Sequence, residues 1–241
     1  MVERPLVLLP VWAELHVDNL LLSFIFKSET TLPFRELELT AGQLIYEADA
    51  RVDLVYFPRG SIISLVSSLS TGQSVEAAMV GRDGIIGASA ALDGKISLSK
   101  AVVQIGGPAT VCTPDAFKSA AMKSERLHSV IIRHEQAVYA QAQQSVACNV
   151  THQVGSRLAR WMLRARDLSK SDTLPFTQEF LAEMLGVQRT SISPVANSLQ
   201  QAGLIKYTRG SIQITNAGGL RDVACECYDT VKQRYAALLG V

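Results

Sequence analysis

Cysteine is scarce in this 241-residue sequence, which has Cys112, Cys148, Cys225 and Cys227. Their spacing matches neither a CxxC zinc pair nor a disulfide framework, and the absence of a cluster near the N-terminus argues against an iron–sulfur site there. Along the chain, the pair Cys225-x-Cys227 has no second pair and no histidine nearby. We therefore expect ordinary thiols, no metal ligands and no cofactor.

Long apolar runs are also missing. The longest, Leu20 to Phe26, is interrupted by Ser23 and is far too short to span a bilayer. The N-terminus shows no charged segment followed by an apolar run, as a secretion signal would. We expect a cytoplasmic protein that has no membrane partner.

Sequence signatures of catalysis are absent. The four histidines, at positions 16, 128, 134 and 152, lie in helical contexts without a neighbouring nucleophile or metal-ligand spacing. The sequence contains no G-x-S-x-G, H-E-x-x-H or P-loop. Gly81-x-x-Gly84-x-x-Gly87 lacks the spacing of a dinucleotide-binding loop and is more typical of turns. Of the function classes, an enzyme is therefore disfavoured.

The net charge of +1 conceals an asymmetry along the chain. Residues 1–150 carry a net −3, residues 151–215 a net +4 and residues 216–241 zero. A compact basic segment is where a polyanion such as DNA would bind.

Regularly spaced short strands are indicated between Arg35 and Cys112. Apolar or alternating runs end at Gly and Pro breaks, such as Pro58-Arg59-Gly60 and Gly106-Gly107-Pro108. This texture is typical of a β-sandwich or roll. The fold class predicted is α+β, beginning with a jelly-roll-like β-roll sensor domain over residues 1–124; a short helix is expected around Leu15 to Phe26.

After Pro114 the apolar period changes to that of a helix, and neither Gly nor Pro occurs from Asp115 through Val154. We assign residues 125–149 to a long dimerisation helix, because one small β-roll cannot cover its whole apolar stripe. The alternative is a helix that lies only on its own domain. The predicted seam consists of Leu127, Ile131, His134, Val138 and Gln141.

Residues 150–241 have the pattern of a winged helix-turn-helix with a C-terminal helix. Thr177 caps a helix that ends at Gly186, a tight turn follows, and a second helix runs to Gly203. Two alternating strands around Thr208-Arg209-Gly210-Ser211 complete a hairpin, or wing.

The second helix should present short polar groups and an arginine to the DNA major groove, where an arginine can bind guanine O6 and N7. Thr177 is placed to bind a phosphate, and the wing to neutralise others. A protein–protein module is the alternative use of this motif. The predicted DNA-binding residues are Thr177, Gln188, Arg189, Thr190, Ser191, Ser193, Lys206 and Arg209.

Pro194 conflicts with a straight second helix, because proline removes a backbone hydrogen bond and clashes with the preceding turn at a cost of roughly 3 kcal/mol. Either the helix kinks, or Ser193 caps a shorter helix that has Pro194 at its first position. We favour the kink.

Residues from about 40 to 240 resemble the Crp/Fnr family of bacterial regulators. The motifs that carry the resemblance are Val55-Tyr56-Phe57-Pro58, Met79-Val80-Gly81-Arg82-Asp83-Gly84, His152 with Arg157-Leu158-Ala159-Arg160-Trp161, and Leu174-Pro175-Phe176-Thr177-Gln178-Glu179 continuing to Gly186-Val187-Gln188-Arg189-Thr190-Ser191. The resemblance implies a cyclic-nucleotide-binding-like β-roll, a dimerisation helix and homodimeric binding to double-stranded operator DNA. It also implies RNA polymerase as a partner and Arg189 as a base-reading residue. Thr190 and Pro194 replace the family's usual Glu and Arg, so the operator should differ from the best-known one.

Cyclic-nucleotide-binding members of that family use a Gly-Glu pair and an Arg-Ser or Arg-Thr pair. The corresponding positions here are Gly87-Ala88 and Ser99-Lys100, and the first pair lacks the carboxylate for a ribose. We expect that cyclic AMP is not the effector, and the sequence names no other. Candidate effector contacts are Arg82, Ser99 and Lys100; Glu76, Asp83 and Asp93 are expected to be turn or surface residues.

The predicted function is a bacterial transcription regulator that binds an inverted-repeat operator as a homodimer. Two alternatives stay open: a regulator that responds to a cyclic nucleotide, and a thiol redox sensor that acts through Cys148 or Cys112. Cys148 lies where the helix seam meets the DNA-binding domain, but a small buried apolar role is the simpler interpretation of either thiol.

Overall fold

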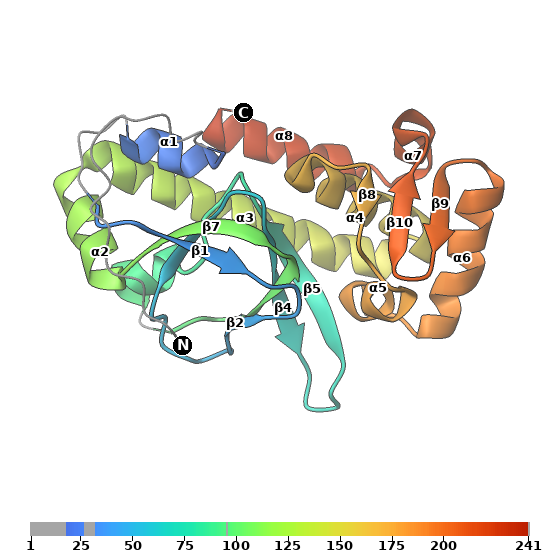
Figure 1. The fold of residues 1–241 in the computed structure, drawn as a ribbon, viewed down its shortest axis with the longest axis horizontal. Coiled ribbons are helices and arrows are strands. Elements are labelled where there is room, and N and C mark those ends of the chain that lie inside the picture. Colours follow the sequence, from blue (N-terminus) through green and yellow to red (C-terminus); the bar gives the residue numbers. More distant parts are fainter. Residues whose placement is uncertain (1–17, 27–31, 95, 241) are drawn as a thin grey trace. The chain divides into compact units, whose positions relative to one another are not determined.

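The computed structural model describes residues 18–26, 32–94 and 96–240 (Figure 1). The chain forms two compact units. The first contains the described residues up to Ile63 together with Val80–Glu135, and the second contains Ser64–Met79 and Gln136–Val241. Of the helix expected around Leu15 to Phe26, the described part is α1 (Leu20–Phe26), and Leu15 lies outside the described residues. None of the helices in the described ranges has the length and apolar character that crossing a bilayer requires.

The first unit is built on antiparallel strands, as the Gly and Pro punctuation predicted. One sheet has the order β1-β7-β3, and in a second sheet β2 pairs with β6. The bounds are β1 (Arg35–Leu39), β2 (Leu44–Tyr46), β3 (Val55–Pro58), β6 (Lys100–Ile105) and β7 (Gly107–Cys112). A single turn of π-helix, η1 (Ala90–Gly94), precedes β6. The short strand β2 was not among the predicted runs.

Aromatic side chains and one buried amide close the core of this unit. Phe57 of β3 and Phe117 of α2 (Pro114–Lys123) are fully buried, with ring centroids 6.2 Å apart. The buried Asn19 amide donates hydrogen bonds of 2.8 Å to the carbonyl oxygens of Pro58 and Gly84. The residue before α1 is thereby joined to the end of β3 and to the loop at Gly84, which are distant in sequence.

The helical region after Pro114 is divided, although it contains no Gly or Pro. At Ser124 the backbone is extended (φ −131°, ψ 102°), which ends α2, and α3 (Glu125–Thr151) begins at the next residue. The Ser124 hydroxyl accepts a hydrogen bond of 3.2 Å from the backbone N–H of Leu127. A serine cap therefore starts α3. Its first residue matches the start predicted for the long helix, and its last lies two residues beyond the predicted end.

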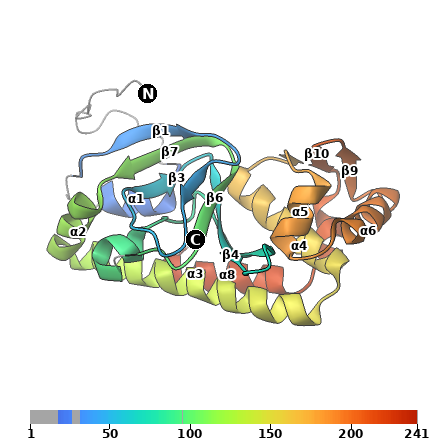
Figure 2. The same ribbon diagram turned by 90° about the horizontal axis from the view of Figure 1, so that it is seen from below.

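Two further strands, β4 (Ile62–Ser68) and β5 (Ser74–Val80), complete a four-stranded sheet of order β2-β6-β4-β5. Residues 64–79, from the two strands and the turn between them, belong to the second unit. That unit also holds a three-stranded sheet of order β8-β10-β9 and the helices that follow α3 (Figure 1). Figure 2 shows α4, α5 and α6 on the same side of the picture as β9 and β10. The bounds are α4 (Val154–Ser169), β8 (Thr173–Leu174), α5 (Gln178–Leu185), α6 (Arg189–Gln201), β9 (Ile205–Thr208), β10 (Ser211–Ile214), α7 (Ala217–Val223) and α8 (Cys227–Leu239).

Trp161 of α4 lies at the centre of the second unit. Its ring packs edge-on against Phe176 and Phe180, at centroid distances of 4.8 and 5.9 Å. Its indole N–H donates a 2.9 Å hydrogen bond to the carboxylate of Glu76 on β5. Glu76 also accepts a hydrogen bond from the hydroxyl of Ser64 on β4. These contacts join α4 to the hairpin of residues 64–79.

Glu76 is buried, which corrects the expectation that it is a turn or surface residue. Burial raises the pKa of its carboxyl, while the Ser64 hydrogen bond and the charge of Arg160 lower it. The alternation of β5 alone could not reveal this placement, because the polar partners come from β4 and α4.

The substitution Glu76→Ala should destabilise the protein by about 1–3 kcal/mol, because it leaves the Trp161 indole N–H and the Ser64 hydroxyl buried without their acceptor. Urea denaturation followed by tryptophan fluorescence measures the change. Glu183→Ala removes an exposed carboxylate of α5 and serves as the control, with an expected change within about 0.5 kcal/mol. Equal effects of the two substitutions would contradict the role given to Glu76.

Candidate nucleic-acid interface

The helix-turn-helix is formed by α5 and α6 and the turn between them, as predicted. The Thr177 hydroxyl accepts a 3.2 Å hydrogen bond from the backbone N–H of Phe180 and so caps α5. Gly186 ends α5 in the left-handed conformation (φ 62°). A Cβ on Gly186 would also lie 3.2 Å from Val75 of the hairpin, so the turn favours glycine for its space as well as its φ.

The sequence of α6 divides into a buried face and an exposed N-terminal end. Ile192, Ala196 and Leu199 are buried, at the spacing of one helix face. Gln188 and Arg189, at the start of the helix, are exposed, as is Thr190. Because apolar packing fixes the other face, the polar N-terminal end belongs to the face of α6 that stays open to a ligand.

Pro194 lies inside α6, which runs without interruption from Arg189 to Gln201. The alternative of a shorter helix that begins at Pro194 is therefore wrong. The Pro194 side chain is exposed and Ile192 is buried, so the proline ring does not disturb the core. Proline donates no backbone hydrogen bond, so the second turn of α6 has one helical hydrogen bond fewer than an alanine would allow.

Arg189 is the charged group at this end of α6. Its side chain is 68% exposed, and its nearest carboxylate is that of Glu179 on α5, at 3.9 Å and 80% exposed. An exposed ion pair at this distance contributes about 0–1 kcal/mol. The guanidinium can therefore exchange Glu179 for a stronger partner at little cost.

Two of the predicted contact residues are less accessible than the others. Ser191 is half-buried, and so is Ser193, whose hydroxyl donates a 2.6 Å hydrogen bond to the side-chain oxygen of Gln178 on α5. Ser193 therefore joins the two helices of the motif.

The wing is a hairpin with a two-residue loop. Thr208 of β9 pairs with Ser211 of β10, and the loop residues between them are Arg209 and Gly210. Gly210 has φ 81°, which glycine adopts without strain. Arg209 and Lys206 are both exposed, as a role in phosphate neutralisation requires.

Only part of the basic excess of residues 151–215 lies on the surface. Arg157 and Arg160 are buried in α4, and the Arg157 guanidinium donates to the carbonyl of Leu185 at the end of α5. Arg164 donates to the Met79 carbonyl at 3.3 Å and lies 4.6 Å from the centroid of the Tyr235 ring. The sequence count therefore overstates the charge available to a polyanion.

The stripe of α3 predicted as the dimer seam is covered by the chain itself. Leu127, Ile131, His134 and Gln141 are buried, and Val138 is half-buried. His134 Nε2 accepts a 3.1 Å hydrogen bond from the backbone N–H of Ile85, and the Gln141 amide oxygen accepts one of 2.9 Å from the Tyr235 hydroxyl. The structure thus places these side chains inside their own units and leaves a different stripe of α3 exposed.

The three candidate effector contacts lie in separate local interactions. The Arg82 guanidinium forms a 2.9 Å ion pair with Asp18, and Lys100 lies 3.8 Å from the Glu47 carboxylate. The backbone N–H and C=O of Ser99 both bond to the Ser97 hydroxyl.

The thiols considered as redox residues differ in their surroundings. Cys112 is buried in β7, and burial raises its pKa to about 12. Cys148 is buried near the end of α3. The hydrogen bond with the Cys225 thiol, assisted by the charge of Arg160, lowers the pKa of Cys148 to about 5 against the effect of burial.

The comparisons with known proteins agree with this geometry. A family model described as the Crp-like helix-turn-helix domain matches residues 156–223, which include all but the first two residues of α4 and the whole motif from α5 to β10. No curated protein matches the chain in sequence.

Solved structures of transcription regulators share the fold. FixK2 from Bradyrhizobium japonicum has 15% identity and a TM-score of 0.68 over 80% of this chain and 98% of its own. A CRP-family regulator from Thermus thermophilus has 20% identity and a TM-score of 0.64, over 79% of this chain and 96% of its own. The c-di-GMP responsive regulator CLP from Xanthomonas campestris has 11% identity and a TM-score of 0.60, over 80% of this chain and 97% of its own. Residues 156–223 thus match the Crp-like helix-turn-helix domain, and the chain has the fold of solved Crp/Fnr transcription regulators.

Proposed function

We propose that the protein binds an inverted-repeat DNA operator as a homodimer and that Arg189 reads a base in each half-site. The observation that carries the proposal is the exposed polar end of α6, which holds Gln188, Arg189 and Thr190 on a helix anchored by Ile192 and its neighbours. The N-terminal end of a recognition helix is the part that enters the major groove. An arginine there can donate two hydrogen bonds to one guanine.

Contacts to the DNA backbone would position this helix. Thr177 is exposed at the N-terminus of α5, and a hydroxyl that accepts a capping hydrogen bond can still donate to a phosphate oxygen. Lys206 and Arg209 on the wing would neutralise phosphates and make the affinity dependent on salt. Ser191 and Ser193 are half-buried, so they would hold α6 in place beside the residues that contact bases and would make few base contacts themselves.

The homodimer would form along the exposed stripe of α3 instead of the predicted one. Three large apolar side chains recur at intervals of seven on this stripe: Ile132, Tyr139 and Val146, which are 48, 66 and 67% exposed. Val150, four residues after Val146, is 84% exposed. Apolar residues at heptad spacing on an exposed helix face are the pattern that pairs two helices.

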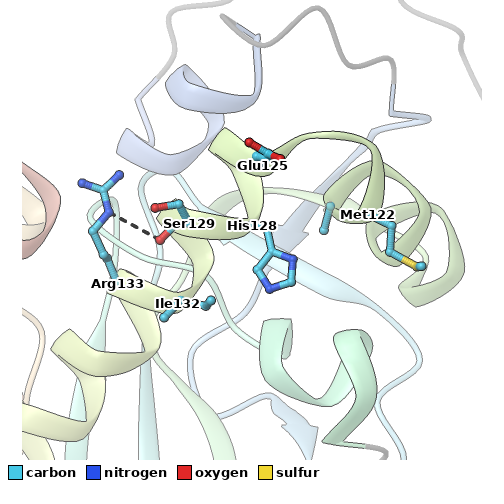
Figure 3. A pocket seen from close by; sticks show the side chains of 7 residues that line it. Met122, Glu125, His128, Ser129, Ile132 and Arg133 are labelled. Carbon is cyan, nitrogen blue, oxygen red and sulfur yellow. Dashed lines mark hydrogen bonds between the residues drawn. The ribbon is translucent and has the colours of Figure 1, made fainter.

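A surface pocket adjoins the N-terminal end of this stripe in the first unit (Figure 3). It has a volume of about 340 Å³ and is lined by residues from the end of α2 and the start of α3, among them Met122, Ser129 and Ile132. Met122 is 74% exposed. The pocket combines the exposed apolar side chains of Met122 and Ile132 with the polar side chains of Glu125, His128 and Arg133, and it would receive side chains of the partner copy.

Regulation would take place in the bacterial cytoplasm, where the operator is, with RNA polymerase as a further partner.

We also propose that cyclic AMP is not the signal. A Cβ on Gly87 would lie 2.8 Å from Val52 and 3.2 Å from the Leu54 carbonyl, and Ala88 is buried, so the position of the usual ribose-binding pair is closely packed. Lys100 already faces Glu47. The effector of one protein of this fold, CLP, is a different nucleotide, c-di-GMP.

Replacing Arg189 with alanine should weaken operator binding by about 1–3 kcal/mol per half-site and relax base preference at one position of each half-site. Lys206→Ala should weaken binding to all sequences alike. It should also lower the slope of log affinity against log salt concentration by about 1 per subunit, or about 2 per dimer. Fluorescence anisotropy with an operator selected from random DNA, repeated over a salt series, measures both.

The control for charge is Arg221→Ala, because the Arg221 guanidinium is already paired with Asp229 at 2.7 Å. It should leave affinity and base preference unchanged. An Arg189→Ala protein that keeps the affinity and base preference of the wild type would contradict the proposed reading helix.

Tyr139→Glu or Val146→Glu should convert the dimer to monomers. Each substitution removes an apolar contact of about 1.5–3 kcal/mol from both subunits and adds a buried charge, so the dimer dissociation constant should rise by 100-fold or more, roughly. Sedimentation velocity over a concentration series measures it. Val223→Glu changes another exposed valine, at the end of α7, and should leave the dimer intact. Dimers of unchanged stability in both α3 variants would exclude this stripe as the seam.

A further inference from the structure

The second unit brings three cysteines and a histidine together. Cys148 lies in the last turn of α3, and His152 directly follows the last residue of that helix. The backbone N–H of His152 donates a 3.0 Å hydrogen bond to the Cys148 carbonyl, so the two side chains lie on one face. Cys227 is the first residue of α8, and Cys225 precedes it by two. Along the chain, Cys225 and Cys227 have no histidine and no further cysteine nearby. In the folded second unit, His152 and Cys148 lie beside them.

The distances among the four side chains suit a single metal ion. Cys148 Sγ and Cys225 Sγ are 3.5 Å apart, Cys227 Sγ and His152 Nδ1 are 3.6 Å apart, and all four potential ligand atoms lie within 4.8 Å of one another. Zinc bonds of about 2.3 Å to sulfur and about 2.0–2.1 Å to nitrogen place tetrahedral ligands roughly 3.5–3.8 Å apart. Small side-chain movements would bring all four atoms to an ion at their centre.

Groups around the cluster are arranged as the outer shell of a metal site. His152 presents Nδ1 to the cluster, while its Nε2 lies 3.1 Å from a carboxylate oxygen of Glu226. A carboxylate on the far ring nitrogen fixes the tautomer and orientation of a ligating histidine. The Gln144 amide donates a 3.1 Å hydrogen bond to Cys227 Sγ. Both contacts would hold a ligand atom toward the centre of the cluster.

Charge and burial favour a closed thiolate site. Three thiolates and a divalent ion carry a net negative charge, and the buried guanidinium groups of Arg157 and Arg160 lie near enough to Cys148 and Cys225 to interact with it electrostatically. The cysteines are buried. Four protein ligands leave no position for a substrate, which is the arrangement of a structural zinc site.

We propose that Cys148, His152, Cys225 and Cys227 bind one Zn²⁺ ion and that this ion fastens the start of α8 to the end of α3. Sulfur-rich tetrahedral sites select zinc over the harder divalent ions. The ion would restrain the chain next to α4, the first helix of the matched DNA-binding domain. The proposal does not depend on DNA binding, because it concerns the loading and stability of the second unit.

The first measurement is the zinc content of the full-length protein, purified with Zn²⁺ and a thiol reductant and then dialysed. Native mass spectrometry should find one Zn²⁺ per chain, bound with loss of protons. Substitution by Co²⁺ should give intense thiolate-to-cobalt charge-transfer bands and the visible bands of tetrahedral cobalt. Addition of Zn²⁺ to metal-free protein should raise its melting temperature.

Variants assign the ligands. His152→Ala, at a partly exposed helix end, and Cys227→Ser should bind no Zn²⁺ and show no rise in melting temperature. Cys112→Ser removes a buried thiol outside the cluster and should keep one ion. Glu226→Gln should keep the site but weaken the affinity about 10–100-fold. Circular dichroism of each variant shows whether it folds.

Three results would overturn the proposal. The first is wild-type protein without zinc after dialysis, the second is a cobalt spectrum without thiolate bands, and the third is zinc retained by the folded His152→Ala protein at wild-type affinity. A Cys148–Cys225 disulfide that dissolved oxygen forms in the Zn²⁺-supplemented protein once the reductant is removed, with hydrogen peroxide as the reduced product, would favour the thiol redox sensor instead.

Discussion

The second unit depends on the side chain of Trp161. Its ring packs against Phe176 and Phe180, on either side of the cap of α5, and its indole N–H bonds to the buried carboxylate of Glu76. This position sets α5 against α4. The left-handed turn at Gly186 and the hydrogen bond from Ser193 to Gln178 then set α6 against α5. The exposure of Arg189 is thus a consequence of packing that begins at one indole ring.

The DNA-binding half of the fold could be predicted from the sequence because its signals are local. A cap at Thr177, a glycine stop at Gly186 and a two-residue hairpin loop that includes Gly210 each act within a few residues, and each has the predicted geometry. Local rules also gave most strands of the β-roll. They missed the two short strands β2 and β8, which have too few residues to show a period, and the break at Ser124, which no glycine or proline marks.

Contacts between distant segments could not be predicted in the same way. The helical period of apolar residues located the apolar stripe of α3 correctly. The period does not indicate which surface covers the stripe, and residues such as Ile131 pack within their own chain. Exposed apolar residues on the same helix, such as Tyr139, gave a weaker signal because apolar residues such as Val138 and Ala140 stand next to them along the chain. Likewise, a spacing of four residues on a helix places Cys148 and His152 on one face, which the sequence could indicate. Only the fold brings Cys225 to them.

The proposed function depends on the polar end of α6 reaching the bases of a duplex in both subunits. Hydroxyl-radical footprinting of the protein on a DNA fragment selected from the genome tests this most directly. The expected pattern is two-fold symmetric, and the centres of its two halves lie about one helical turn, or 10–10.5 base pairs, apart. A single protected half without symmetry, or protection that stays the same when the bound sequence is scrambled, would contradict it.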